Sequence, residues 1–492
     1  MKLNELLRGL EGLETGLDVG AEVTSLAYDS RRVQPGTLFF AIQGEKADGH
    51  AFIPQVLERG AVAIVSERLP PPELTSRWVR VPRIRRALSA AGRVFFGQPD
   101  LHLKLIGITG TNGKTTTAFL LESILRAAGV RAGLFGTIEY RFGERTMPAL
   151  NTTPESLDLW SYFAQTVAAG GTGVVMEVSS HALAQERVWG FPYSVAVFTN
   201  LTRDHLDYHK DFDHYFEAKR RLFEGLGTPP PQWAIINLDD PWGRKLLDVP
   251  CAHRLTYGLN SDAQVKVKHL EQRHHGLEGT IVTPAGKLRL ASPLIGRANL
   301  ANILAATAAS IAYGIPLEKI ERGLEDLKAV PGRFERIDEG QPFLVVVDYA
   351  HTDDALRNVL STARELTHNR LIVVFGCGGE RDRAKRPLMG EAAGSLSDLA
   401  ILTSDNPRSE DPLLIMSDAL VGLQKAGKPY WAEVDRETAI RKAIEKAGEG
   451  DVVVLAGKGH ETYQILKDRT IHHDDREAAR KILREMDYGP RG

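Results

Sequence analysis

Cysteine is almost absent from this chain of 492 residues, which contains only Cys251 and Cys377. Two isolated thiols exclude a disulfide framework and a zinc site built on clustered cysteines, and they favour a reducing compartment. The chain also lacks an apolar run long enough to cross a bilayer, and its start has no continuous apolar segment of the kind that signal peptides carry. We therefore expect a cytoplasmic protein with no membrane insertion.

An excess of charge is also absent, because 61 basic residues stand against 63 acidic ones and the net charge is −2. This balance argues against a surface that holds nucleic acid or anionic lipid, so any phosphate binding must be local. What the chain does have is length for about three domains of roughly 150 residues each. We expect small-molecule partners, no nucleic acid, and a monomer.

Two joints divide the chain into segments 1–103, 104–331 and 332–492. The first joint is "GQPDLHLK", before the strand-like "LIGIT", and the second is "AVPGRFERID", before "FLVVVDYAH". The middle segment alternates strands and helices through "LIGIT", "GVVMEVSS", "SVAVFTN" and "WAIINLDD". This alternation predicts a parallel α/β domain, with a more antiparallel insertion around 263–291.

The last segment carries four buried-type strands that alternate with helix-like stretches, which indicates a second parallel sheet with right-handed crossovers. Parallel sheets bind ligands beyond the carboxyl ends of their strands. The polar loops "YAHTDD", "GCGGERD", "SDNPR" and "GKGHE" each follow one of these strands. We therefore expect all four loops at one rim.

A phosphate-binding loop is predicted at "GITGTNGKTTT", which lies between a strand and a helix. Glycines let backbone N–H groups face the phosphates, and the helix N-terminus favours the anion. Lys114 would reach the β and γ phosphates, and Thr115 would ligate Mg²⁺. The usual spacing asks for glycine where this chain has Ile108, so the loop is a variant with Gly107 and Gly110 on either side. The alternative is a glycine-rich turn with a chance lysine, which the register of strand, Gly-Lys-Thr and helix argues against.

Two further polar residues follow strands of the middle segment. Glu177 of "MEVSSH" is placed to give Mg²⁺ an oxygen ligand. His205 of "TNLTRDHLDYH" fits a functional histidine and a hydrogen-bonded structural one equally well.

Lys219 lies on the apolar stripe of a predicted helix, "FDHYFEAKRRLFEGL", with Tyr215, Phe216, Leu222 and Phe223. Such a lysine commonly extends its amine to water. A buried amine has a depressed pKa instead, and a neutral amine can react with CO₂ to give a carbamate that binds metal. The residues alone leave both possibilities open.

The loops of the last segment carry opposite charges. Arg381 and Arg408 can each bind a carboxylate through two hydrogen bonds, and Glu461 can bind an ammonium group. Separately, each also fits as surface charge, and "DNPR" fits as a turn in which Pro407 fixes φ. Their common placement after strands favours a recognition site for a molecule that carries both charges.

The order of eight motifs resembles the Mur ligase family: "GTNGKTTT", "NTTPES", "EVSSHAL", "TNLTRDHLDYH", "YAHTDDAL", "GCGGERDRAKRPLMG", "DNPRSEDP" and "AGKGHETYQ". The resemblance starts at "YDSRRVQPGTLFFAIQG" and covers nearly the whole chain. It implies an α/β fold of three domains: an N-terminal UDP-binding domain (1–103), a central P-loop-type parallel-sheet ATPase domain (104–331) and a C-terminal Rossmann-like, amino-acid-binding domain (332–492). "DNPR" is similar to the tetrapeptide of members that add meso-diaminopimelate to UDP-N-acetylmuramoyl-L-alanyl-D-glutamate.

The resemblance also implies roles for the residues at matching motif positions. ATP is expected at Gly110, Thr111, Asn112, Gly113, Lys114, Thr115, Thr116 and Asn302. The acceptor nucleotide is expected at Ser30, segment 45–47, Asn151, Thr152, Thr153, Ser179, Gln185 and Arg187. Diaminopimelate is expected at Arg381, Asp405, Asn406, Pro407, Arg408, Gly457 and Glu461. Mg²⁺ is expected at Thr115, Glu177, His205 and a carbamylated Lys219 (N6-carboxylysine), and the catalytic set at Lys114, Lys219, His205 and Glu177.

The implied reaction is an ATP-dependent ligation through an acyl phosphate in peptidoglycan precursor synthesis, with closure of the C-terminal domain onto the central one. Alternatives are the same ligation with L-lysine or L-ornithine, and a ligase similar to folylpolyglutamate synthetase, which does not resemble "DNPR" plus "GKGHE". A P-loop nucleotide switch would want Asn-Lys-x-Asp after the loop, and the chain has none there. A non-catalytic nucleotide-binding protein is disfavoured by Lys114, Thr115, Glu177 and Lys219.

Overall fold

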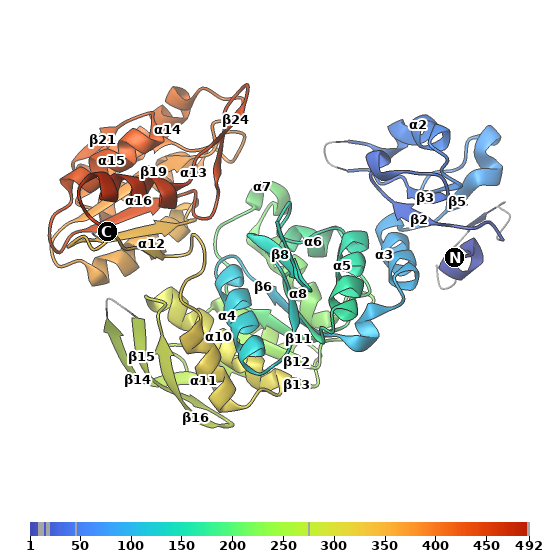
Figure 1. The fold of residues 1–492 in the computed structure, drawn as a ribbon, viewed down its shortest axis with the longest axis horizontal. Coiled ribbons are helices and arrows are strands. Elements are labelled where there is room, and N and C mark those ends of the chain that lie inside the picture. The colour runs from blue at the N-terminus through green and yellow to red at the C-terminus, as the bar shows by residue number, and fades with distance from the viewer. Residues whose placement is uncertain (8–13, 16–19, 45–46, 274–275, 490–492) are drawn as a thin grey trace.

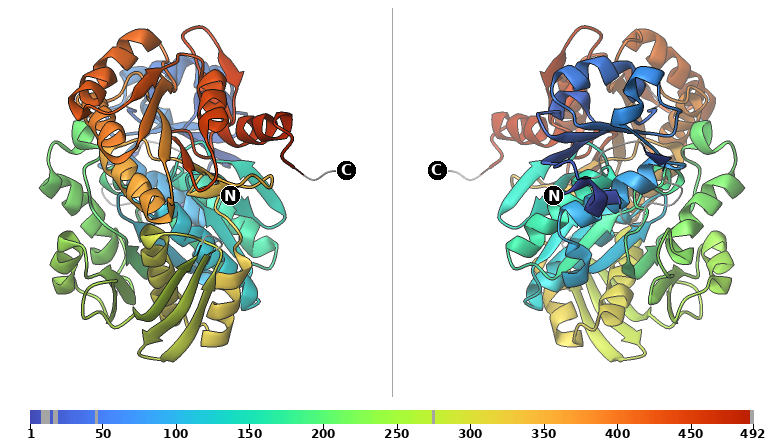
Figure 2. Two further views of the ribbon diagram at one scale, coloured as in Figure 1. Left: turned by 90° about the vertical axis from the view of Figure 1, so that its left-hand side faces the viewer. Right: turned by 90° about the vertical axis from the view of Figure 1, so that its right-hand side faces the viewer.

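The computed structural model describes residues 1–7, 14–15, 20–44, 47–273 and 276–489, and it has three α/β domains in chain order (Figure 1). The N-terminal and C-terminal domains both stand on the same side of the central domain, as the two turned views of Figure 2 show. Positions 45 and 46 of the expected acceptor segment lie outside the described residues. None of the helices in the described part of the chain has the length and apolar character needed to cross a membrane.

The N-terminal domain is built on a sheet of order β1-β5-β4-β3-β2, in which β1 alone is antiparallel to its neighbour. Apolar side chains of β3, β4 and α3 are buried on the two faces of this sheet. Its elements are β1 (Glu14–Thr15), β2 (Ser25–Ala27), β3 (Thr37–Phe40), β4 (Ala63–Ser66), β5 (Trp78–Arg80), α1 (Leu3–Leu7), α2 (Ile53–Glu58) and α3 (Ile84–Phe95).

The central domain has a sheet of order β13-β12-β11-β6-β10-β7-β8-β9. The strands from β13 to β7 are parallel, as predicted, but β8 and β9 form an antiparallel edge, so the sheet is mixed. The strands are β6 (Lys104–Thr109), β7 (Ala132–Phe135), β8 (Glu139–Phe142), β9 (Arg145–Pro148), β10 (Gly173–Glu177), β11 (Tyr193–Phe198), β12 (Trp233–Asn237) and β13 (His253–Tyr257).

Helices cover both faces of this sheet, because its strands are apolar on both sides. They are α4 (Lys114–Ala127), α5 (Ser156–Ala168), α6 (Ser180–Ala184), α7 (Leu206–His209), α8 (Phe212–Glu224), α9 (Pro241–Lys245), α10 (Arg297–Tyr313) and α11 (Leu317–Asp326). The predicted antiparallel insertion is a separate sheet at the far end of the domain (Figure 1), formed by β14 (Lys266–Arg273), β15 (Gly276–Thr283) and β16 (Gly286–Ser292).

The C-terminal domain has a sheet of order β17-β18-β22-β19-β20-β21. The four predicted strands, β18 (Leu344–Asp348), β19 (Leu371–Cys377), β20 (Leu399–Ser404) and β22 (Val452–Ala456), are mutually parallel, which confirms the prediction. The other elements are β17 (Glu335–Ile337), β21 (Tyr430–Ala432), β23 (Tyr463–Ile465), β24 (Thr470–His472), α12 (Asp353–Leu366), α13 (Lys385–Leu396), α14 (Pro412–Ala426), α15 (Arg436–Lys446) and α16 (Asp475–Glu485).

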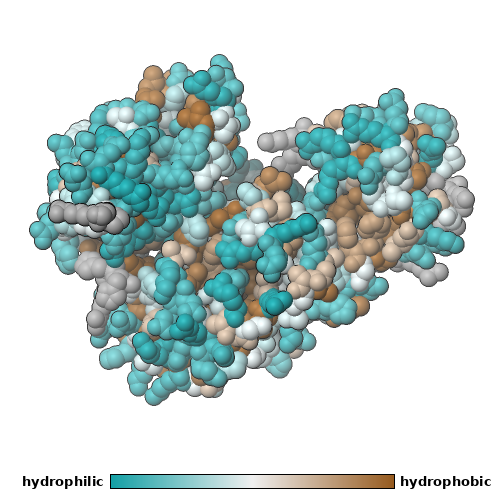
Figure 3. Space-filling model, viewed as in Figure 1, coloured by the Kyte–Doolittle hydropathy of each residue, from teal (hydrophilic) through white to brown (hydrophobic). Residues whose placement is uncertain are grey.

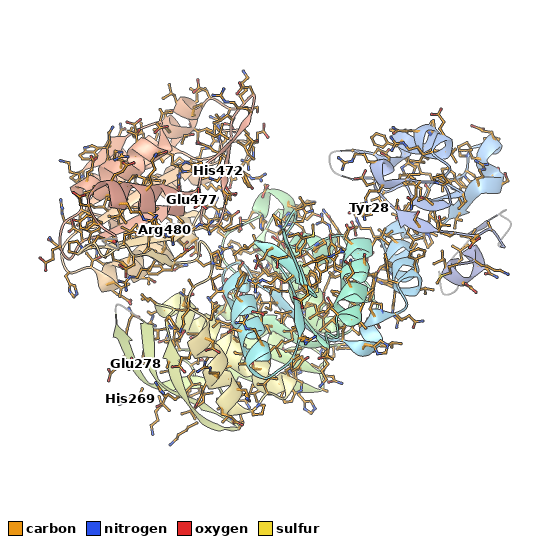
Figure 4. All side chains as sticks on the ribbon, in the orientation of Figure 1. Tyr28, His269, Glu278, His472, Glu477 and Arg480 are labelled. Atoms are coloured by element: carbon orange, nitrogen blue, oxygen red, sulfur yellow. The ribbon has the colours of Figure 1, made fainter. Side chains whose placement is uncertain are left out.

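The N-terminal domain is fastened to α5 of the central domain. Tyr28, on the side of its domain that faces the central domain in Figure 4, donates a hydrogen bond of 2.5 Å to Asp158. Arg32 donates to the same carboxylate at 2.7 Å, and Leu157 belongs to the core of the N-terminal domain. A hollow separates the N-terminal and C-terminal domains above the central one in the space-filling view of Figure 3. The carboxyl end of β10 and the loop after β6 belong to the central domain beneath.

Candidate active site

The loop between β6 and α4 turns at two glycines with positive φ, Gly110 at 145° and Gly113 at 87°. Nζ of Lys114 folds back under this loop and donates to the carbonyl oxygens of Gly110 (2.9 Å) and Thr111 (2.8 Å). Burial lowers the pKa of Lys114. A Cβ on Gly113 would lie 2.3 Å from Oδ1 of Asn302, so the loop and α10 approach each other closely at this point.

Hard oxygen atoms gather beside the lysine. Thr115, at the start of α4, donates through its hydroxyl to Glu177 at the end of β10 (3.1 Å). Thr137 donates to the same carboxylate through its backbone N–H (2.8 Å) and its hydroxyl (3.0 Å). Glu177 is only 1% exposed, so its carboxylate is shielded from bulk water. A hydroxyl and a carboxylate next to a phosphate-binding loop are donors that suit Mg²⁺.

Lys219 is buried on the apolar stripe of α8, with 1% exposure, so it does not extend to water. Its Nζ donates to the carbonyl oxygen of Gly110 (2.7 Å) and lies 4.4 Å from the centroid of the Tyr215 ring. Burial, and after it the charge of Lys114, holds the pKa of Lys219 well below its ordinary value. A lowered pKa favours the neutral amine, which is the form that reacts with CO₂.

His205 follows β11 and has a left-handed backbone, with φ 54°. Its Nε2 lies 3.3 Å from Asp204, and its ring contacts those of His181 and Tyr215 edge-on. Burial lowers the pKa of His205 to about 4, so the ring is neutral near pH 7. Within the described residues, no three or more His, Cys, Asp and Glu side chains converge as a metal site. Any cation here would depend on hydroxyl, carbamate or phosphate oxygens as well.

Most of the residues expected at the acceptor nucleotide gather around the end of β10. The hydroxyl of Thr153 donates to the carbonyl of Glu177 (2.9 Å) and accepts from the N–H of Ser179 (3.0 Å). Arg187 donates to the carbonyl of Thr153 (3.3 Å), and the Thr152 hydroxyl is 3.1 Å from that of Thr137. Gln185 donates to Tyr208 (3.4 Å), and Asn151 is exposed.

Ser30 lies apart from this group, in the short 3₁₀ helix Ser30–Arg32 of the N-terminal domain. The neighbouring Tyr28 and Arg32 tie this turn to Asp158 of α5, the helix that begins just after Thr153. Ser30 therefore belongs to the turn that joins the N-terminal domain to α5, whereas the remaining residues belong to the central domain.

A cavity of about 550 Å³ lies between the central and C-terminal domains. Asp204, His205 and Tyr208 line it on the central side. On the C-terminal side all four predicted loops contribute, which confirms the shared rim, through residues that include Arg381, Asp405, Asn406, Arg408, Gly457 and Glu461. Pro407 is the one residue of the expected set that does not line the cavity, because its carbonyl packs against Gly379.

Charged and polar groups on this rim hold one another in place. Glu461 accepts from Asn406 (2.9 Å) and from the buried amine of Lys458 (3.0 Å). Arg408 has a left-handed backbone with φ 54°. Its backbone N–H donates to the carbonyl oxygen of Ile465 (3.0 Å), and its guanidinium donates to the carbonyl oxygen of Gly379 (2.7 Å). The C-terminal wall of the cavity thus presents the guanidinium groups of Arg381 and Arg408 together with carboxylates that include Asp405 and Glu461.

The structure adds residues that the sequence analysis did not name. Arg333 donates to the hydroxyl of Thr115 (3.2 Å) and lies over the Tyr349 ring. The amide of Asn112 donates to Asp354 of the C-terminal domain (3.2 Å), and Lys385 lines the cavity. Arg333 lies in the joint "AVPGRFERID", so the sequence located the joint but gave no signal that its arginine reaches the phosphate-binding loop.

Comparison with known proteins shows the family of this chain. A UDP-N-acetylmuramoyl-L-alanyl-D-glutamate–2,6-diaminopimelate ligase of Solibacter usitatus is 58% identical over 467 residues, which are 95% of this chain and 94% of that protein. The chain belongs to the Mur ligase family. A ligase of the same name from Geobacter metallireducens is 46% identical over 99% of each chain.

Models of the Mur ligase domains match along the same chain: the Mur ligase family catalytic domain at 22–95, the middle domain at 108–310 and the glutamate ligase domain at 332–459. A solved structure of a UDP-N-acetylmuramoyl-L-alanyl-D-glutamate–2,6-diaminopimelate ligase has 34% identity and a TM-score of 0.70, with 99% of each chain covered. Mycobacterium tuberculosis folylpolyglutamate synthase, at 20% identity and a TM-score of 0.61 over 76% of this Mur ligase and 92% of that chain, shares the fold.

Proposed function

We propose that this Mur ligase uses ATP to join meso-diaminopimelate to the γ-carboxylate of D-glutamate in UDP-N-acetylmuramoyl-L-alanyl-D-glutamate, in peptidoglycan precursor synthesis. The observation that carries the proposal is the cavity itself: it lies between the domain of the phosphate-binding loop and a rim with two arginines and Glu461. A ligase needs its activated acid and its incoming amine to meet in such a place. The names of the relatives at 58% and 46% identity agree with this substrate pair.

The first step occurs at the phosphate-binding loop. An oxygen of the γ-carboxylate attacks the γ phosphorus of ATP, ADP leaves, and an acyl phosphate forms. Backbone N–H groups from Gly110 to Thr116 and the amine of Lys114 hold the phosphates, and Asn302 lies against the loop on the nucleotide side. Thr115, Glu177, His205 and a carbamylated Lys219 would hold Mg²⁺, which would supply positive charge to neutralise the phosphates.

The burial of the Lys219 amine and the lowering of its pKa support its role as the carbamylated residue. The amine is inaccessible to bulk water but adjacent to the loop carbonyl of Gly110. A carbamate there would change this position from a donor into an anionic oxygen ligand on the phosphate side. Lys114, Glu177, His205 and Lys219 then form the catalytic set.

The acceptor nucleotide is proposed to lie along the hollow, with its uridine end at Ser30 and segment 45–47 and its dipeptide end at Asn151, Thr152, Thr153, Ser179, Gln185 and Arg187. This direction brings the γ-carboxylate to the end of β10, beside Glu177. Support comes from the hydrogen bonds that connect Thr153 to both Glu177 and Ser179.

Diaminopimelate is proposed to occupy the rim, where Arg381 and Arg408 face its carboxylates and Asp405 and Glu461 its amino groups. Asn406 and Gly457 line the same wall, and Pro407 shapes the turn that carries Arg408. In the second step the amine attacks the acyl carbon, phosphate leaves, and the amide forms. L-Lysine or L-ornithine would leave one guanidinium without its carboxylate, which favours diaminopimelate.

The domain limits 1–103, 104–331 and 332–492, a monomeric state and a cytoplasmic location complete the proposal. The limits are supported by the spans of the three main sheets, which none of the limits crosses.

The test of the function is phosphate release from ATP by the full-length chain. Release that requires both the UDP-linked dipeptide and meso-diaminopimelate supports the ligase, whereas release that either substrate alone sustains would contradict it.

A further inference from the structure

The loop Gly457–Thr462, which gives Gly457 and Glu461 to the cavity, is held from behind by donors that do not touch the cavity. The guanidinium of Arg436 donates to the carbonyl oxygen of Ala456 (2.9 Å). The backbone N–H of His473 donates to the carbonyl oxygen of Thr462 (3.1 Å). The loop is therefore fixed at both ends by the segments that start α15 and α16.

Arg436 and Asp475 form a fully buried ion pair behind this loop. Each is the first residue of its helix, α15 or α16, and each side chain is 0% exposed. The pair is bidentate, at 2.8 and 2.6 Å, and His473 adds a third contact to the carboxylate at 2.9 Å. One guanidinium nitrogen of Arg436, Nη1, is buried and has no hydrogen-bond partner in the described part of the chain.

Stability alone does not account for such a pair. Removing two charges from water costs about as much as their attraction returns, and an apolar pair of similar volume is often equally stable. The unpartnered Nη1 group of Arg436 adds a further cost to the free energy of folding. Local features that break the rules of stable packing are concentrated at functional positions. The site next to this pair is the amino-acid rim.

The hydrogen bond from Arg436 to Ala456 lies one residue away from that rim. Ala456 is the last residue of β22, and Gly457, with φ 112°, comes next. The approach there is close, since a Cβ on Gly457 would lie 2.8 Å from a carboxylate oxygen of Asp405. A small displacement of the end of β22 would therefore change the spacing between Gly457 and Asp405.

The charge of Arg436 also reaches the rim. Burial lowers the pKa of this guanidinium, but the charges of Asp475 and then of Asp405 and Glu461 raise it above its ordinary value. Asp405 and Glu461 line the cavity, and Arg436 is not among the lining residues that the structure describes. Arg436 is thus a buried countercharge on the far side of both carboxylates.

We propose that Arg436, oriented by Asp475, is a positioning residue for the incoming amino acid. It fixes the end of β22, so that Gly457 and Glu461 face Asp405 and Asn406 at the spacing that the amino group of the substrate requires. This inference rests on the proposed function of the cavity. It separates the pair from Arg381 and Arg408, which face the substrate directly.

The test replaces the ion pair by an apolar pair in the full-length protein, Arg436→Met with Asp475→Leu. We expect a thermal midpoint near that of the unchanged chain, a KM for meso-diaminopimelate about tenfold higher, and KM values for ATP and for the UDP-linked dipeptide within about twofold. The matched control is Arg441→Met with Glu485→Leu, an exposed pair at 2.5 Å that joins the same two helices. This control is expected to leave all three KM values unchanged.

Three results would overturn the inference: unchanged KM values, an equal rise of all three, or an equal effect of the control. If the variant with the apolar pair does not fold, Arg436→Lys is tested in its place. This substitution keeps the positive charge but removes the guanidinium that makes the bidentate contact. A selective rise of the KM for meso-diaminopimelate in that variant supports the inference, and an unchanged KM refutes it. Failure of the proposed function is recognised separately, since the unchanged chain would then show no diaminopimelate-dependent phosphate release.

Discussion

Nζ of Lys219 donates a hydrogen bond of 2.7 Å to the carbonyl oxygen of Gly110, where the phosphate-binding loop turns. The amine reaches the loop from α8, so the helix and the loop are joined through a buried nitrogen whose pKa is lowered. A carbamate on this nitrogen would add two oxygen atoms beyond it. The first prediction follows from this contact.

Lys219→Ala is expected to lower kcat by about 100-fold or more, because the site loses an anionic ligand for the cation that neutralises the phosphates. Short carboxylic acids that enter the vacated space are expected to restore part of the rate. Lys245→Ala, at a half-exposed lysine, serves as the control. Absence of rescue, in a variant whose thermal midpoint is unchanged, would leave the carbamate without support.

Gly113→Ala is expected to raise the KM for ATP at least about tenfold. The new Cβ would lie 2.3 Å from Oδ1 of Asn302, at a residue whose φ is 87°. Gly129→Ala is the matched control, because Gly129 has φ 79° but no atom within 4 Å of the added Cβ. That control carries the strain of a left-handed alanine, about 1 kcal/mol, without the clash. Equal KM values for ATP in the two variants would contradict the close contact between the loop and α10.

Arg333→Met is expected to lower kcat by roughly 10- to 100-fold, since a guanidinium beside Thr115 is placed to stabilise charge on the transferred phosphoryl group. Arg333→Lys should retain part of the rate because the charge remains. Steady-state rates at saturating substrates measure the effect, with Arg322→Met, in an exposed i,i+4 pair, as the control. A full rate in Arg333→Met would show that this contact is only a link between domains.

Arg408→Ala is expected to raise the KM for meso-diaminopimelate by about 100-fold, because a carboxylate of the substrate loses a charged, two-pronged partner. The KM for L-lysine, which lacks that carboxylate, should change little. The ratio of kcat/KM for the two amino acids is the measurement. A variant that discriminates against lysine as strongly as the unchanged chain would show that Arg408 does not read the carboxylate.

His209 is expected to make the protein less stable in mild acid. Burial, followed by the charges of His181 and Lys219, lowers its pKa to about 4. The unfolded chain binds a proton on this residue below about pH 6.5, whereas the folded chain does not until about pH 4, so stability is lost as the pH falls through this window. The loss is about 2 kcal/mol at pH 5.

His209→Gln keeps a partner for the Ser180 hydroxyl, which now lies 2.9 Å from the ring. Urea unfolding at pH 7.5 and at pH 5 should show a smaller pH difference in this variant than in the unchanged chain. The same difference in both proteins would assign the acid sensitivity to other groups.

The sequence was sufficient for the parallel sheets, the phosphate-binding loop and the common rim, because each depends on local pattern and on the direction of strands. The apolar stripe left open whether Lys219 is buried or extends to water, and its 1% exposure in the structure decided for burial. Contacts between residues that lie far apart in the sequence could not be predicted. Arg333 lies in a joint whose folded path depends on two sheets, and Arg436 is 39 residues from Asp475, its partner. Likewise, the sequence did not reveal the antiparallel pairing of β8 and β9, because these edge strands are short and polar.

The most direct measurement offers meso-diaminopimelate, L-lysine and L-ornithine in turn to the full-length chain, with ATP and the UDP-linked dipeptide, and identifies the product by mass. We expect one amide product, the meso-diaminopimelate tripeptide nucleotide, formed with one ADP and one phosphate per amide. A higher kcat/KM for L-lysine or L-ornithine would contradict the assignment of the rim, and ATP hydrolysis without any amide would contradict the ligase itself.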